Sequence, residues 1–166
     1  MSILDEAFEL KEYMVEQRNY FHSHPELGLQ EFNTCNHIEE ELNKAGIKNR
    51  RVAGTNVIAE IDSGRPGKTL FLRADIDALP IQDAKDVPYK SQTPGVMHAC
   101  GHDTHTAMLL GAAKILASIK NEFKGTIRLI FQPDEETAAG AAREIQQGSL
   151  DGVDTIFGLH ILSMDI

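Results

Sequence analysis

The sequence predicts an α/β domain with a mixed, mainly parallel sheet and helices on both of its faces. Two observations lead to this fold class. In the second half of the chain, apolar and β-branched runs typical of strands alternate with segments that have helical periodicity. The chain has 166 residues, of which 42% are hydrophobic and 25% charged, which suits one domain with a substantial core.

The first part of the chain is expected to be helical. In residues 3–23, apolar side chains recur at steps of three, four and seven, so we predict one helix there. The sequence HSHPELG ends this helix, because Pro25 disfavours a helical conformation at the residue before it. A second helix is expected at about 30–45 and ends near Gly46.

The strands are expected to begin after these helices. TNVIAEID (55–62) and TLFLRADID (69–77) are apolar, β-branched runs, and the turn sequence SGRPGK between them predicts neighbouring strands. The expected later elements are a helix at 102–120, a strand at 125–133, a helix at 135–148 closed by Gly148, and a strand at 154–161.

Composition and charge exclude several classes of partner. A net charge of −9 disfavours binding to nucleic acid or to an anionic membrane, and no apolar run approaches the roughly 20 residues of a membrane span. The N-terminus lacks the basic and apolar regions of a signal peptide. We therefore expect a cytoplasmic protein whose two cysteines, Cys35 and Cys100, are reduced, with Cys35 an ordinary helical thiol.

Four groups of polar residues fall at predicted strand ends or helix starts, where open α/β sheets place their ligand sites. They are RADID (73–77), HACGHD (98–103), PDEE (133–136) and GLH (158–160). One cavity that combines cysteine, histidine and glutamate donors with additional carboxylates is typical of a two-metal hydrolase.

Cys100 and His102 are the first candidate ligands. With Gly101 between them, a thiolate and an imidazole can turn into one cavity and bind a metal such as zinc. The alternative is a buried free cysteine beside a histidine at a helix start. Asp103 suits the dipole of the helix that follows. His105 lies one turn after His102 and could share its face, but it is expected to be a solvated helical residue.

Glu135 and Glu136 follow a strand and are expected at a helix start, where the macrodipole favours carboxylates. The functional alternative is that one binds metal while its neighbour acts as a general base. His160 ends an apolar strand, so it is either a satisfied core or edge histidine or a ligand.

Asp75 and Asp77 alternate along one strand and therefore point to the same side of it. Two buried carboxylates on one side require a cation or hydrogen-bond donors. Arg73 lies on that side as well, so an ion pair is the structural alternative to a metal.

Taken in order and spacing, RADIDALPI, MHACGHDTHTAMLLGAAKIL, FQPDEE and GLH resemble the aminoacylase/carboxypeptidase-type metallopeptidase family. The sequence FHSHPELGLQEFNT resembles the amidohydrolase branch of that family, which includes hippurate hydrolases, auxin-conjugate hydrolases and N-acetyl-diaminopimelate deacetylases. The resemblance covers nearly the whole chain and implies a partial zinc-peptidase-like catalytic domain.

The resemblance also implies roles for individual residues. Glu135 would be the general base, and Asp77 would orient a group of the metal site. The implied cofactors are two divalent metal ions, zinc or manganese, with cobalt or nickel possible. The implied substrate is a small N-acyl amino acid whose amide bond is hydrolysed. The implied metal ligands are Cys100, His102, Glu136 and His160.

Family members are more than twice as long as this chain. The resemblance therefore implies that residues 1–166 are the N-terminal portion of the catalytic domain, without the lid and dimerisation domain, the last histidine ligand or the closing part of the sheet. We expect weak or no activity from this chain alone, and homo-oligomers formed through an uncovered sheet edge. The alternatives are a non-catalytic fragment or subunit that binds a metal or small molecule, and a dipeptidase of the same family.

Overall fold

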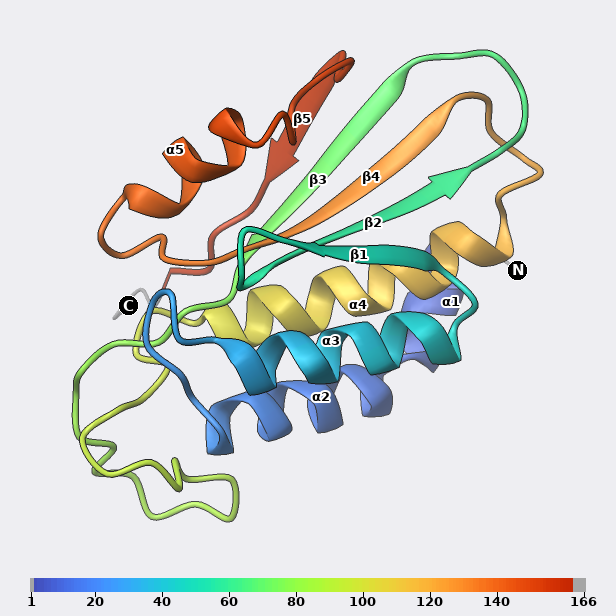
Figure 1. Cartoon of the computed structure of the whole chain (residues 1–166). Helices are drawn as coiled ribbons and strands as arrows, with labels where there is room; N and C mark the ends of the chain where they lie inside the picture. The colour runs from blue at the N-terminus through green and yellow to red at the C-terminus, as the bar shows by residue number, and fades with distance from the viewer. Residues whose placement is uncertain (1, 163–166) are drawn as a thin grey trace.

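The apolar runs of the sequence form a five-stranded sheet in the order β1-β2-β4-β3-β5, in a computed structural model that describes residues 2–162 (Figure 1). The pairs β1–β2 and β2–β4 are antiparallel, whereas β3–β4 and β3–β5 are parallel. The mixed α/β sheet is confirmed, with equal numbers of parallel and antiparallel pairs in place of the expected parallel majority. The strands are β1 (Lys48–Val52), β2 (Asn56–Asp62), β3 (Thr69–Asp75), β4 (Thr126–Gln132) and β5 (Thr155–Gly158).

The expected pairing of β2 with β3 is wrong, because β4 lies between them. Helix α4 (His102–Ser118) connects β3 to β4. As a result β4 runs parallel to β3 and occupies the position between β3 and β2. The connection between β2 and β3 passes the start of β4, where the Gly125 N–H donates to the Arg65 carbonyl over 2.9 Å. A turn sequence between two strands thus did not determine which strands pair.

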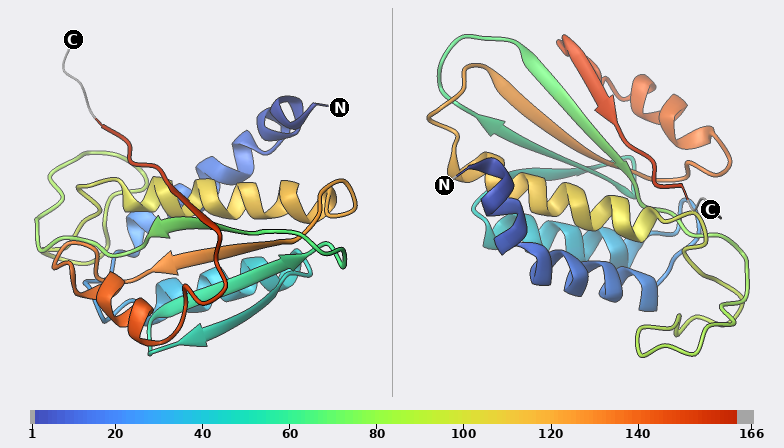
Figure 2. Two further views of the ribbon diagram at one scale, coloured as in Figure 1. Left: turned by 90° about the horizontal axis from the view of Figure 1, so that it is seen from above. Right: turned by 180° about the vertical axis from the view of Figure 1, so that it is seen from behind.

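Helices cover both faces of the sheet, as predicted. Helices α1 (Ile3–Glu9), α2 (Lys11–Ser23), α3 (Phe32–Lys44) and α4 lie on one side, and α5 (Ala139–Gln146) lies on the other (Figure 2). The larger core cluster joins α2, α3 and α4 to one face of β2, β3 and β4. The smaller cluster, on the α5 side, contains Ile58, Phe71 and Ile130.

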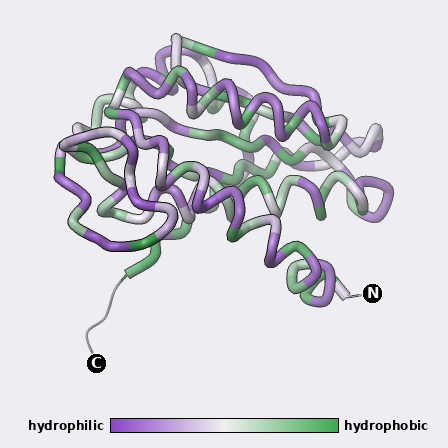
Figure 3. Tube along the Cα trace, turned by 90° about the horizontal axis from the view of Figure 1, so that it is seen from below, coloured by the Kyte–Doolittle hydropathy of each residue, from purple (hydrophilic) through white to green (hydrophobic). Residues whose placement is uncertain are grey.

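The helix expected at 3–23 is two helices, α1 and α2, separated at Leu10. Within residues 2–162, α1 buries no side chain, whereas the C-terminal half of α2 buries Phe21 and its neighbours against the core. Hydrophobic and polar residues alternate along the helices (Figure 3), as expected for segments with one buried side. No helix in the described part of the chain is long and apolar enough to cross a membrane.

The two edges of the sheet differ from the sequence expectation in different ways. β1 was not predicted, because its sequence KNRRV carries charged residues and lies at an edge where both faces are partly solvated. β5 was predicted, but all four of its residues are exposed at the opposite edge. The carboxyl ends of β3 and β5 meet at one end of the sheet because these strands are parallel.

Candidate metal centre

His102 lies at the centre of the site, at the first position of α4. Gly101 precedes it with φ +92°, a left-handed conformation that turns the chain sharply into the helix. The imidazole is completely buried. Its Nδ1–H donates to the backbone carbonyl of Asp77 over 3.0 Å and to Asp77 Oδ1 over 3.1 Å. With the proton on Nδ1, the lone pair of His102 Nε2 is available to a ligand.

His102 Nε2 is buried and has no hydrogen-bond partner among residues 2–162. Three carboxylate oxygens face it: Asp75 Oδ2 at 3.7 Å, Glu135 Oε2 at 3.7 Å and Glu136 Oε1 at 3.9 Å. An unpaired buried nitrogen costs free energy, and so do clustered carboxylates. A bound cation would remove both costs.

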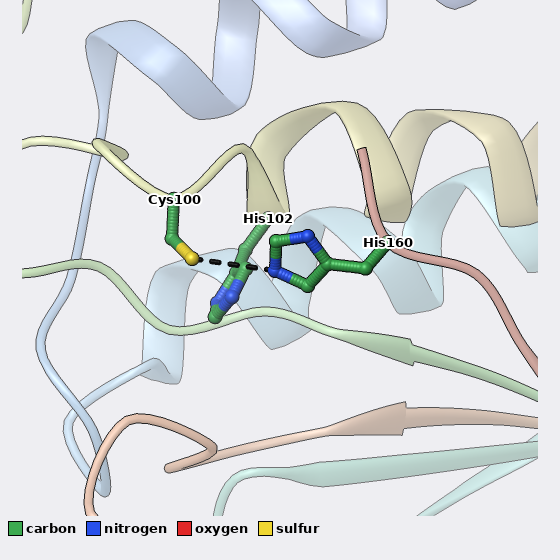
Figure 4. A group of neighbouring side chains, drawn as sticks. All are labelled: Cys100, His102 and His160. Atoms are coloured by element: carbon green, nitrogen blue, oxygen red, sulfur yellow. Dashed lines mark hydrogen bonds between the residues drawn. The ribbon is translucent and has the colours of Figure 1, made fainter. Parts of the chain in front are cut away.

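Cys100 and His160 form the second side of the site (Figure 4). Cys100 Sγ lies 3.3 Å from His160 Nε2, and these atoms and a ring nitrogen of His102 all lie within 4.8 Å of one another. Cys100 belongs to the loop before α4, and His160 follows β5 by two residues. The parallel pairing of β3 with β5 therefore brings together residues 60 positions apart in the chain.

Glu135 and Glu136 lie in a turn and not at the helix start that the sequence predicted. The helix begins at Ala139, after two non-glycine residues in the left-handed region, Asp134 at φ 52° and Ala138 at φ 60°. This turn directs both glutamates towards His102, and the Glu136 N–H donates to Asp77 Oδ2 over 3.1 Å. Uncommon backbone conformations of this kind occur at functional sites.

The surroundings of the site raise the pKa of Cys100 and lower the pKa of Asp77. Burial raises the pKa of the Cys100 thiol to about 11, and the neighbouring Glu136 adds to this effect. Burial alone would raise the pKa of Asp77, but hydrogen bonds from His102 and from the Glu136 backbone outweigh it and lower the pKa. A bound metal ion would reverse the effect on the thiol, because a coordinating thiol is deprotonated.

Two further expectations for this region need correction. His105 is buried and not solvated, and its Nδ1 lies 2.5 Å from Asp75 Oδ1. Asp103 is more than a charge at a helix start, because its Oδ2 lies 2.7 Å from His22 Nδ1 and 3.2 Å from Arg18 Nε. The spacing of three residues between His102 and His105 places both on one face of α4, an alternative that the sequence offered and that the solvated interpretation wrongly set aside.

The remaining candidate residues lie as the sequence indicated. Arg73 Nη1 donates to Asp75 Oδ2 over 2.7 Å, so the expected ion pair on that side of β3 exists. Cys35 is buried in α3, where its thiol donates to the Thr55 carbonyl over 3.0 Å. It is thus a structural thiol away from the site. The donors around His102 are one sulfur, ring nitrogens and carboxylate oxygens, a set that fits zinc and similar divalent metals.

Comparison with known proteins shows the family to which the chain belongs. The model of peptidase family M20/M25/M40 matches residues 71–165, which contain every candidate ligand. The chain belongs to this family. The M20 match begins within β3 and includes the loop before α4 and the turn of the paired glutamates.

Relatives within the family carry different names. Thermostable carboxypeptidase 2 of Saccharolobus solfataricus is 46% identical over 159 residues, which is 93% of this chain and 40% of that protein. N-acetyl-L-cysteine deacetylase of Bacillus subtilis is 47% identical over 152 residues, which is 91% of this chain and 36% of that protein. The chain thus spans about two fifths of the length of these M20 relatives.

A solved structure shows the same fold. The crystal structure of a Bacillus subtilis protein described as a dinuclear metal-binding peptidase of the M20 family superposes with a TM-score of 0.89 at 45% identity. The match covers 91% of this chain and 43% of that one. Members of the M20 family are hydrolases, so this chain is related to enzymes through both its sequence and its fold.

Proposed function

We propose that this chain carries the hydrolytic centre of a metal-dependent amidohydrolase that cleaves the amide bond of N-acyl amino acids. One observation carries the proposal: the buried Nε2 of His102, which has no hydrogen-bond partner within residues 2–162, faces three carboxylates and lies beside the Cys100–His160 pair. The similarity to a deacetylase of an N-acetylated amino acid supports the choice of substrate class. The proposed metal ligands are Cys100, His102, Glu136 and His160.

We assign separate roles to the metal ions and to the protein residues. Two divalent ions, zinc or manganese, with cobalt or nickel as alternatives, would supply Lewis-acid chemistry that lowers the pKa of water and polarises an amide carbonyl. Glu135 takes a proton from the attacking water and returns it to the leaving amine. Asp77 holds the Nδ1–H of His102, which keeps Nε2 directed into the site. The same carboxylate anchors the backbone of Glu136.

We also propose that residues 1–166 are the N-terminal portion of a larger catalytic domain, because they span only about two fifths of the relatives' length. The lid and further donors would lie outside them. His160 is exposed and the Glu135 side chain is 38% exposed, so this half of the site is open to water. Electrostatic catalysis is weaker in a wet site, so we expect slow turnover from these residues alone. The exposed apolar edge at β5 is the proposed contact for homo-oligomers.

The experiment that tests this function compares metal content with activity. The chain is dialysed against zinc or manganese, analysed for bound metal, and assayed on N-acetyl amino acids and on dipeptides. We expect Glu135→Gln to keep the metal and lose about 10²- to 10⁴-fold in rate. Cys100→Ser should lose metal and activity together. Glu122→Gln, at an exposed position remote from the site, is the control that should change neither.

Each outcome decides between the proposed function and an alternative. Faster turnover of dipeptides than of N-acetyl amino acids would favour a peptidase, as the name of the carboxypeptidase relative suggests. Metal binding without turnover of either substrate would favour a binding module. Absence of metal in the unsubstituted chain would contradict the proposal.

A further inference from the structure

We infer that His105 is a positioning residue, which holds the segment that presents His160 to the metal centre. The inference rests on the proposed function only in that His160 is taken to be a ligand. His105 belongs to α4, whereas His160 follows β5, so the link joins two elements that are remote in sequence. Five contacts of residues 73–161 support it.

The first contacts fix the direction of the hydrogen bonds through the His105 ring. The backbone N–H of Ile161 donates to His105 Nε2 over 3.0 Å, so this nitrogen is the acceptor and carries no proton. The proton of the neutral ring is therefore on Nδ1, which donates to Asp75 Oδ1 over 2.5 Å. A backbone N–H can only donate, so this tautomer follows from the geometry.

The same contacts exclude His105 as a metal ligand. One of its ring nitrogens lies within 4.8 Å of donor atoms of His102 and Asp75, so these three residues together have metal-ligand spacing. However, both nitrogens of His105 are already engaged, one by Asp75 and one by Ile161. A neutral imidazole with both nitrogens in hydrogen bonds has no lone pair left for an ion. The ring acts through its neighbours.

The Asp75 carboxylate, which accepts from His105, is itself held in place. Its Oδ2 accepts from Arg73 Nη1 over 2.7 Å, and its side chain is completely buried. A carboxylate fixed in this way orients the imidazole that donates to it, as outer partners of metal sites do. Arg73 and Asp75 lie on β3, so the sheet determines where the His105 ring points.

On its other side, the His105 ring contacts the segment that contains His160. The Ile161 N–H bonded to His105 is adjacent to His160 in the backbone, and the two histidine rings meet edge to face with centroids 4.7 Å apart. The Ile161 side chain lies over Gly101, where a β-carbon would overlap its Cδ1 atom. Gly101 stands between Cys100 and His102. Two contacts, one with His105 and one with Gly101, therefore hold the His160–Ile161 segment beside the proposed ligands.

The first test does not depend on metal binding. In metal-free protein labelled with ¹⁵N-histidine, nitrogen chemical shifts report the tautomer of each ring. We expect His105 to be neutral with its proton on Nδ1, and the Ile161 amide to exchange slowly with solvent. In His105→Leu that amide should exchange faster. An Nε2-protonated His105, or an unchanged Ile161 amide in the variant, would overturn the inference even if the site binds no metal.

The second test measures Co²⁺ or Zn²⁺ affinity by titration. Loss of an outer partner of a metal ligand typically costs about 10- to 100-fold in affinity, and we expect this from His105→Leu. His105→Gln should recover part of the loss, because an amide can donate to Asp75 and accept from Ile161. His37→Leu is the control, since the His37 ring hydrogen-bonds to Gln17 of α2, which belongs neither to β3 nor to the His160 segment.

A double-variant cycle separates positioning from a general effect on the fold. If His105 acts through His160, then His105→Leu should have little further effect on metal affinity once His160→Ala is present. Equal losses in the two backgrounds would show that His105 acts elsewhere and would contradict the inference. If the unsubstituted chain binds no metal, the proposed function fails, and the tautomer and the Ile161 amide still decide the role of His105.

Discussion

The two halves of the metal centre differ in how the fold holds them. The inner half, which comprises His102, Asp75, Asp77 and His105, is at most 3% exposed and is linked to β3 and α4 by hydrogen bonds. The outer half, which comprises Cys100, His160, Glu135 and Glu136, lies in loops and is partly or fully exposed. The inner half is preorganised by the hydrophobic core, whereas the outer half depends on a few contacts and on whatever ion it binds.

Metal binding should produce the largest of the expected effects, and it should act mainly on the outer half. At a free metal concentration about 1,000 times Kd, binding to the folded state alone stabilises it by about 4 kcal/mol. Urea denaturation with and without a chelator measures this gain. Hydrogen exchange should show protection at Glu136 and Ile161 beyond that given by their existing hydrogen bonds, and little change in β3. Equal protection gains in both halves would mean that the inner half is not preorganised.

Asp77→Asn tests the inner half through its charge. The pKa of Asp77 is lowered in the folded state, so its ionised form contributes stability above the unfolded-state pKa, and this contribution is lost as pH falls through the folded pKa. At pH 7 the variant should lose about 2 kcal/mol, because hydrogen bonds to a buried charge are removed. The difference from the unsubstituted chain should shrink in acid. A difference that does not depend on pH would contradict the assigned role of the Asp77 charge.

His102→Ala and His160→Ala compare the halves directly in metal-free protein. His102→Ala removes a buried ring and the donor to Asp77 Oδ1, so we expect a loss of about 1–2 kcal/mol in the free energy of unfolding. His160→Ala changes an exposed side chain and should stay within about 0.5 kcal/mol. Both should weaken metal binding. Similar stability losses would remove the distinction between the halves.

Gly101→Ala should have a modest effect on stability and a clear effect on the site. Gly101 has φ +92°, and a β-carbon there would overlap the Ile161 side chain. The left-handed conformation costs a non-glycine residue about 1 kcal/mol. Thermal unfolding measures this loss, and metal titration should show weaker binding because the His160 segment is displaced. Gly46→Ala, also left-handed but with open space around it, is the matched control. Unchanged metal affinity in Gly101→Ala would argue against that contact.

The sequence predicted the inner framework better than the details of the outer half. Helical periodicity and β-branched runs are local signals, so α4, β3 and β4 were found with nearly correct bounds. The order of strands was missed because the insertion of β4 between β2 and β3 depends on tertiary packing. β1 was missed because the charged residues of KNRRV give no apolar pattern.

The candidate site shows the same division between local and long-range information. The motifs named Cys100, His102, Glu135 and His160, and the fold brings them together. The turn at Asp134–Ala138 was missed, because two non-glycine residues in left-handed conformations have no reliable signature in sequence. The burial of His105 was missed as well, because its partners Asp75 and Ile161 come from two other segments.

The most direct test of the central claim is X-ray absorption spectroscopy of the zinc-loaded chain, with Cys100→Ser for comparison. The account predicts up to two zinc ions per chain and a zinc–sulfur contribution that disappears in the variant, with nitrogen and oxygen ligands for the remainder. A spectrum without sulfur, or one that is identical in Cys100→Ser, would show that zinc does not bind at the centre formed by Cys100, His102 and His160.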